Sequence, residues 1–134
     1  MKIICNVAGV ALLALTGNAA HACFKYDKPG VTVAGTLVVR EYFVMPEYGD
    51  SPATDVKMQQ AIVMLDKPIC TDKSDLDREE SDQMEVTLLT TARMSFSRYV
   101  GKHVTAKGTM LHATSRNHHT PLLLVLEARP VVQK

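Results

Sequence analysis

The sequence predicts an all-β domain, because apolar residues alternate along several segments, β-branched residues dominate those segments, and turn residues separate them. The first segment runs from Val31 to Met45 and is the longest. Gly35 lies inside this segment and predicts a bend, since a glycine in a strand often marks a bulge or a corner. The following stretch, 46–52, is rich in proline, glycine and aspartate, so we expect the chain to turn back there.

Four more strands follow along the chain. Met58 to Leu65 is the predicted second strand, closed by Asp66-Lys67-Pro68, and residues 72–82 form an acidic loop before a third strand at 84–89. The fourth, 104–111, repeats the Val-Thr-x-x-Gly-Thr pattern of the first, so its glycine should mark a second corner. The fifth strand begins at Pro121 and ends before Pro130.

A short helix is predicted between the third and fourth strands, because Phe96, Tyr99 and Val100 form an i, i+3, i+4 stripe and Gly101 follows as a stop. Three strands, a helix and two strands are the order of a small five-stranded Greek-key barrel, the OB-fold. We therefore expect an OB-fold-like β-barrel. The residues expected to face its interior are Val33, Leu37, Ile62, Met64, Val86, Leu88, Phe96, Val104, Leu123 and Val125.

The N-terminus predicts a signal peptide over residues 1–22, which leaves a single domain at 23–134. Lys2 precedes an apolar run, and Ala20-His21-Ala22 is a small-x-small cleavage site. The product is expected in the periplasm or secreted, where Cys23 and Cys70 can form a disulfide. Two unpaired thiols, or a lipid on Cys23, are the alternatives. Ala20 stands where bacterial lipoproteins usually carry Leu, which favours the unlipidated product.

Charge and motifs narrow the classes of function. Removal of the signal peptide takes away Lys2 and no acidic residue, so 14 basic residues balance 14 acidic ones. A neutral domain lacks the electrostatic pattern of a nucleic-acid or anionic-membrane binder. The sequence contains no G-x-S-x-G, no G-x-G-x-x-G and no phosphate-binding loop, so we predict no enzyme activity and no cofactor. No membrane span is predicted, and the oligomeric state is left open.

Several segments resemble a family of bacterial secreted single-domain proteins of unknown function. They are Cys23 with Tyr26, Val31–Leu37, Leu65–Cys70, Val100–Val104 and Thr114–Pro121. The family pattern ends in Thr-Gly-His-His-His-Thr-Pro, whereas this chain has Ser115-Arg116-Asn117 before its two histidines. The resemblance implies export, a Cys23–Cys70 disulfide and a barrel, and it implies no established activity.

Histidines form the one chemical cluster in the sequence, since His112, His118 and His119 flank a single connection between the last two strands. Adjacent residues of an extended chain point to opposite sides, so at most one of His118 and His119 should share a side with His112. Two imidazoles are too few for a zinc site, and we predict no metal site. In the structural interpretation His119, Thr120 and Thr114 hydrogen-bond across the loop. Direct ligand contact is the other interpretation.

We therefore predict an exported, non-enzymatic binding or accessory module of the bacterial cell envelope. The loops 46–55 and 114–120 would meet another envelope protein or a small ligand, because loops on a rigid barrel usually carry binding. The candidate binding residues are His112, Thr114, His118, His119, Thr120 and Tyr48. Three alternatives are a histidine-based metal-binding periplasmic protein, an inhibitor or accessory of another envelope protein, and an enzyme whose catalytic residues the sequence does not identify.

Overall fold

A computed structural model describes residues 22–134, so the predicted signal peptide lies outside the described residues except for Ala22. The elements are β1 (Val31–Phe43), β2 (Lys57–Thr71), β3 (Glu80–Leu89), the 3₁₀ helix η1 (Ser97–Tyr99), β4 (His103–His112), β5 (Leu122–Leu126) and β6 (Val131–Val132). Across this part of the chain, no helix has the length and apolar character needed to cross a membrane.

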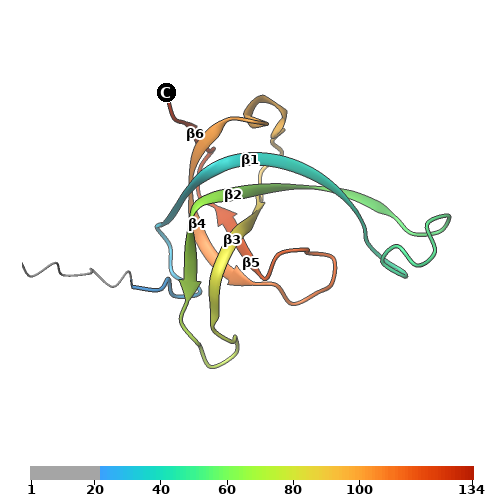
Figure 1. Cartoon of the computed structure of the whole chain (residues 1–134), viewed down its shortest axis with the longest axis horizontal. Helices are drawn as coiled ribbons and strands as arrows, with labels where there is room; N and C mark the ends of the chain where they lie inside the picture. The colour runs from blue at the N-terminus through green and yellow to red at the C-terminus, as the bar shows by residue number, and fades with distance from the viewer. Residues whose placement is uncertain (1–21) are drawn as a thin grey trace, which may run out of the picture.

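The first five strands form a closed barrel (Figure 1). Their order is β1-β2-β3-β5-β4, and β1 also pairs with β4, which closes the sheet. The β3–β5 pair is parallel and the other pairs are antiparallel. The predicted five-stranded OB-like barrel is therefore confirmed. The short strand β6, which pairs with β4 beyond Pro130, was not predicted.

Two glycines let the barrel turn its corners. A Cβ atom at Gly35 would lie 2.0 Å from the carbonyl oxygen of Met64, and one at Gly108 would lie 2.0 Å from that of Val125. No other residue type permits so close a backbone approach. The two positions occupy the same place in the repeated Val-Thr-x-x-Gly-Thr pattern, as the sequence predicted.

The barrel interior is filled by apolar side chains from all five strands. Five of the predicted core residues belong to this cluster, namely Val33, Leu37, Val86, Leu88 and Val104, and Phe96 packs against it while half-buried. The prediction was wrong for β2 and β5, where Val63, Leu65, Leu122 and Leu124 fill the interior instead of Ile62, Met64, Leu123 and Val125. A shift of one residue moves a side chain to the opposite face of a strand.

The predicted helix was also wrong in type, because only the 3₁₀ turn Ser97–Tyr99 forms there. Tyr99 is buried and Phe96 is half-buried, whereas Val100 is 47% exposed. An i, i+3 pair without its i+4 partner matches the three-residue period of a 3₁₀ helix. So short a segment also falls well below the length at which an α-helix is stable. Gly101 ends the turn with a φ of 76°, as predicted.

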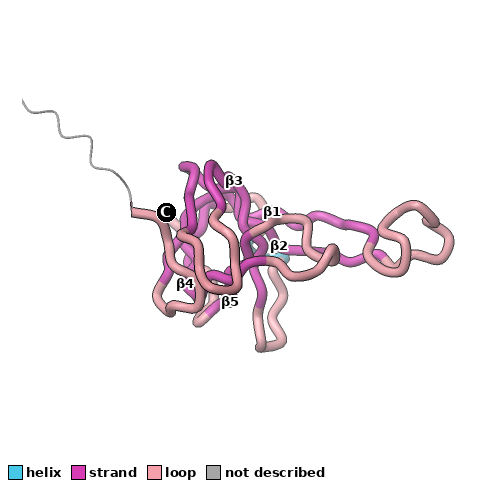
Figure 2. The backbone as a smooth tube through the Cα atoms, turned by 90° about the horizontal axis from the view of Figure 1, so that it is seen from below, coloured by secondary structure: helices cyan, strands magenta, loops and turns pink. Residues whose placement is uncertain are grey.

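The β1–β2 hairpin extends beyond the barrel as a twisted ribbon, which we call the arm and define as residues 38–61 (Figures 1 and 2). Past Leu37, β1 pairs only with β2, with the register Arg40↔Gln60 and Tyr42↔Met58. At its other end β2 runs on to Thr71 through two irregularities, well past the predicted end at Leu65. The arm and the connection between β4 and β5 project from the same side of the barrel (Figure 1).

Candidate binding site

The tip of the arm is ordered by one buried carboxylate. Asp55 accepts hydrogen bonds from the backbone amides of Glu47 at 2.6 Å, Gly49 at 2.7 Å and Ser51 at 3.3 Å. Burial alone would raise the pKa of this carboxyl, but the three amides outweigh it and the pKa lies below its ordinary value. The turn that results holds Tyr48 at a positive φ of 54°.

The β4–β5 loop, residues 113–121, lies against the arm, and we call their contact the seam. The guanidinium of Arg116 lies 4.2 Å from the centroid of the Tyr48 ring. The imidazole of His119 stacks on Tyr42, with the centroids 3.5 Å apart and the planes 15° from parallel. These contacts bring together the two loops that the sequence singled out.

The seam continues onto the barrel through buried hydroxyl groups. Thr120 Oγ1 donates to the carbonyl of Leu122 at 2.7 Å and accepts from Thr87, whose Oγ1 lies at 2.7 Å and whose backbone nitrogen lies at 3.2 Å. Thr87 pairs in register with both Ile62 and Leu123, so the three share the outer face of the sheet. The loop end thus lies beside the two apolar residues that the core prediction had assigned to the interior.

Three buried polar atoms at the seam have no hydrogen-bond partner among the described residues. They are Gln60 Oε1, Asn117 Oδ1 and His118 Nδ1. Gln60 is only 6% exposed, and its Nε2 donates to the carbonyl of Asn117. An unpaired buried acceptor costs about 1–3 kcal/mol. The seam therefore carries hydrogen-bonding capacity that the fold itself does not use.

Desolvation lowers the pKa of His119 below its ordinary value, while the nearby carbonyl of Phe43 acts in the opposite direction. The imidazole that stacks on Tyr42 is therefore neutral at pH 7.

The other two candidate residues of the loop are Thr114 and His118. Thr114 lies exposed at the start of the loop. His118 is partly buried, and its backbone nitrogen donates to the carbonyl of Ser115 at 3.4 Å.

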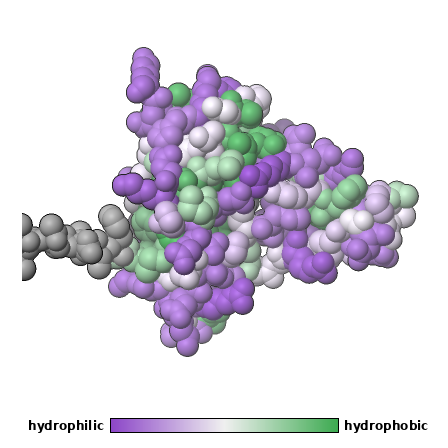
Figure 3. Space-filling view, in the orientation of Figure 1, coloured by the Kyte–Doolittle hydropathy of each residue, from purple (hydrophilic) through white to green (hydrophobic). Residues whose placement is uncertain are grey.

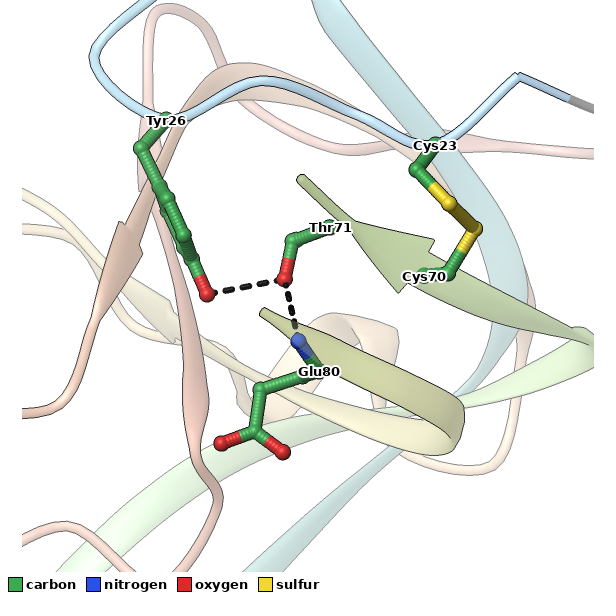
Figure 4. Close-up of a disulfide and its surroundings, with 5 residues drawn as sticks. All are labelled: Cys23, Tyr26, Cys70, Thr71 and Glu80. Carbon is green, nitrogen blue, oxygen red and sulfur yellow. Dashed lines mark hydrogen bonds between the residues drawn. A yellow bond between two sulfur atoms is a disulfide. The ribbon is translucent and has the colours of Figure 1, made fainter. Parts of the chain in front are cut away.

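A second polar cluster lies where the N-terminal segment, residues 22–30, crosses the end of the barrel, and we call this segment the strap (Figure 4). The predicted disulfide is present between Cys23 and Cys70, which are 47 residues apart. The hydroxyl of Tyr26 donates to the carbonyl of Arg78 and accepts from Thr71 Oγ1, both at 2.8 Å. Thr71 Oγ1 in turn accepts from the backbone nitrogen of Glu80 at 3.1 Å.

His112 belongs to the strap cluster and not to the seam. Its Nε2 lies 2.8 Å from Glu80 Oε1, its Nδ1 lies 2.9 Å from the carbonyl of Ala113, and its ring meets Tyr26 edge-on. The hydrogen bond from His112 is the main reason why the pKa of Glu80 lies below its ordinary value. The structure thus gives His112 partners different from those of His118 and His119. Within residues 22–134 no three His, Cys, Asp or Glu side chains are grouped to hold a metal ion.

Sequence reasoning missed Gln60, Arg116 and Asn117 as members of the seam. Gln60 carries the one usable signal, since it is a polar residue directly before the apolar run Ala61–Leu65. Arg116 and Asn117 lie in a polar loop, where nothing in the local sequence identifies the strand that they contact.

The profile of a domain of unknown function, DUF4431, matches residues 83–128. The match spans 46 of the 134 residues and includes most of β3, all of β4 and β5, and the β4–β5 loop. The chain is thus similar to this domain over the half of the barrel that supplies one side of the seam. No curated protein and no solved structure matches the chain.

Proposed function

We propose that the protein is an exported, non-enzymatic binding module of the bacterial cell envelope, and that the seam with the arm tip is its ligand-contacting surface. One observation carries the proposal: the β4–β5 loop meets the arm through ring stacking and a cation–π contact, yet three buried polar atoms there have no hydrogen-bond partner among the described residues. Such a contact is able to exchange its loop–arm bonds for ligand bonds.

The position of this surface on the barrel supports the proposal. OB-type barrels bind their ligands with the connection between strands 1 and 2 and the connection between strands 4 and 5. Here those connections are the arm tip, 44–56, and the β4–β5 loop. The arm also exposes Met45, Val56 and Met58, and methionine is common at adaptable binding surfaces.

The export part of the proposal rests on other features. The Cys23–Cys70 disulfide is compatible with an oxidising compartment. The N-terminal Lys2, apolar run and Ala20-His21-Ala22 supply the expected signal. The accessory or inhibitory role that the sequence left open would use the same surface.

A capture experiment tests the proposal. The exported protein is immobilised with its disulfide intact and exposed to envelope extract from the cells that produce it. We compare it with a seam variant, Tyr48→Ala with Arg116→Ala, and with the control Leu76→Ser, which changes a side chain 94% exposed in the acidic loop.

The proposal expects one component retained in stoichiometric amount by the protein and the control, and reduced about tenfold or more by the seam variant, as for a hot-spot pair. If all three proteins retain the component equally, the binding surface lies outside the seam. No retained component at all would remove the binding function.

A further inference from the structure

Along the arm, one edge of β1 has no backbone partner among the residues that the structure describes. The nitrogen of Leu37 donates to the carbonyl of Lys102 at 3.0 Å, and the nitrogen of Gly101 donates to the carbonyl of Leu37 at 2.8 Å. Residues before Gly101 do not continue this pairing, because Gly101 has a positive φ and the chain before it forms η1. Alternate residues of a strand direct their N–H and C=O groups to the same edge. The N–H and C=O groups of Val39 and Glu41 therefore point to the same edge as those of Leu37. Among the described residues, no backbone group pairs with them there.

An apolar groove lies beside this edge. Its volume is about 440 Å³, and the side chains that line it come from the arm and from the segment before β4. The apolar lining residues are Val39, Ala61, Met94, Phe96 and Val100. Val39 is 36% exposed and Val100 47% exposed. Apolar surface is visible where the arm leaves the barrel (Figure 3).

Three arginines surround an adjoining hollow. Arg93, Arg98 and Arg129 line a space of about 340 Å³, which shares Met94, Ser95 and Ser97 with the groove. Arg40 and Arg78 form ion pairs with carboxylates, whereas none of these three does within the described residues. In a domain with balanced charge this is a concentrated positive site. Guanidinium groups match carboxylates in geometry as well as in charge.

We propose that this surface binds an extended acidic polypeptide segment of a partner protein, which adds a strand to β1 at Val39–Glu41 and places a carboxylate in the arginine hollow. The free backbone groups supply the ladder, the groove takes alternate side chains, and the arginines supply charge complementarity. This goes beyond the proposed function, since it concerns the edge and the groove and not the seam.

A second copy of this chain fits the edge less well. An antiparallel pairing of two β1 edges about Glu41 would set two like charges opposite each other, which destabilises a sheet. It would also leave both arginine hollows without a carboxylate. Self-association is therefore an outcome that the experiment must separate from peptide binding.

The test begins with a phage-displayed library of random dodecapeptides, selected on the exported protein. We expect the enriched peptides to alternate β-branched or aromatic residues and to carry Asp or Glu towards one end. The peptide enriched most strongly is synthesised, labelled and titrated by fluorescence anisotropy. Sedimentation of the unliganded protein reports self-association.

Two matched pairs of variants locate the binding. Glu41→Pro removes the outward N–H, which β2 does not use, while Glu41→Ala keeps it, and proline is tolerated at strand edges. Arg93→Gln with Arg129→Gln removes charge from the hollow, while Tyr48→Ala with Arg116→Ala removes the seam contacts. We expect Glu41→Pro and the double-glutamine variant each to weaken binding about tenfold or more. Glu41→Ala and the seam variant should stay within about twofold.

Equal binding by Glu41→Pro and Glu41→Ala would overturn strand addition, and enriched peptides without acidic residues would overturn the role of the arginines. Loss of binding in the seam variant alone would place the peptide at the seam, which keeps the proposed function but removes this inference. Failure to enrich any peptide, or dimerisation through β1, would also overturn it. If Glu41→Pro does not fold, hydrogen exchange of the wild-type protein tests strand addition instead. Bound peptide must then slow the exchange of the Val39 and Glu41 amides, and unchanged exchange would overturn the proposal.

Discussion

The strap and the seam are both polar clusters where distant parts of the chain meet, and they differ in how completely they are bonded. At the strap, Tyr26, Thr71, Glu80 and His112 form a connected set of hydrogen bonds beside a disulfide. At the seam lie the three buried side-chain atoms that have no partner within residues 22–134. A saturated network fixes one geometry, whereas an unsaturated one retains capacity for further bonds. We therefore propose that the strap stabilises the fold and that the seam is the surface available for binding.

Removal of the disulfide is expected to change the stability of the strap more than any other variant. Closing a loop over the 47-residue separation of Cys23 and Cys70 contributes about 4 kcal/mol in the chain-entropy model. We expect Cys23→Ser with Cys70→Ser to lose about that much free energy of unfolding, measured by urea titration. A loss below about 1 kcal/mol would show that the strap is held by its hydrogen bonds alone.

Tyr26→Phe tests the hydrogen bonds of the strap. The change removes one hydroxyl, which leaves the buried Thr71 hydroxyl without its acceptor and the carbonyl of Arg78 without that donor. We expect the free energy of unfolding to fall by about 1–3 kcal/mol, the cost of an unsatisfied buried group. Urea unfolding with the disulfide intact measures it, and an unchanged midpoint would contradict a saturated network.

Acid should weaken the strap through Glu80. Its pKa in the folded protein is lowered, chiefly by His112, from an ordinary value of about 4.3. A lowered carboxyl pKa contributes stability that is present above that ordinary value and lost as pH falls through the folded one. The stability difference between the wild-type protein and Glu80→Gln should therefore shrink when unfolding is measured at pH 6, 4 and 3. A difference that is constant with pH would mean that the charge of Glu80 plays no part.

The smallest effect is expected at the seam, from Gln60→Met. The change removes an unpaired acceptor together with the one hydrogen bond to Asn117, so the two contributions oppose each other. We expect the free energy of unfolding to change by less than about 1 kcal/mol, although Gln60 is as buried as Tyr26. A loss as large as that of Tyr26→Phe would show that the seam is a structural contact like the strap.

Local patterns in the sequence determined much of this fold. Alternation located the five barrel strands, and the repeated Val-Thr-x-x-Gly-Thr pattern located both corners, because a bend that brings backbone against backbone requires glycine. The two cysteines left after the predicted cleavage allowed one pairing, which the structure contains. These features depend on a residue and its near neighbours, so they are readable before folding.

Tertiary structure alone decided which faces and loops meet. Both faces of β2 carry apolar residues, so the sequence did not distinguish Ile62 from Val63, and the barrel register placed Val63 inside. The same register put Gln60 under the β4–β5 loop and His112 beside Glu80, which separated the three histidines that the sequence had grouped. Contacts between residues tens of positions apart depend on strand pairing and barrel closure, and no local pattern records them.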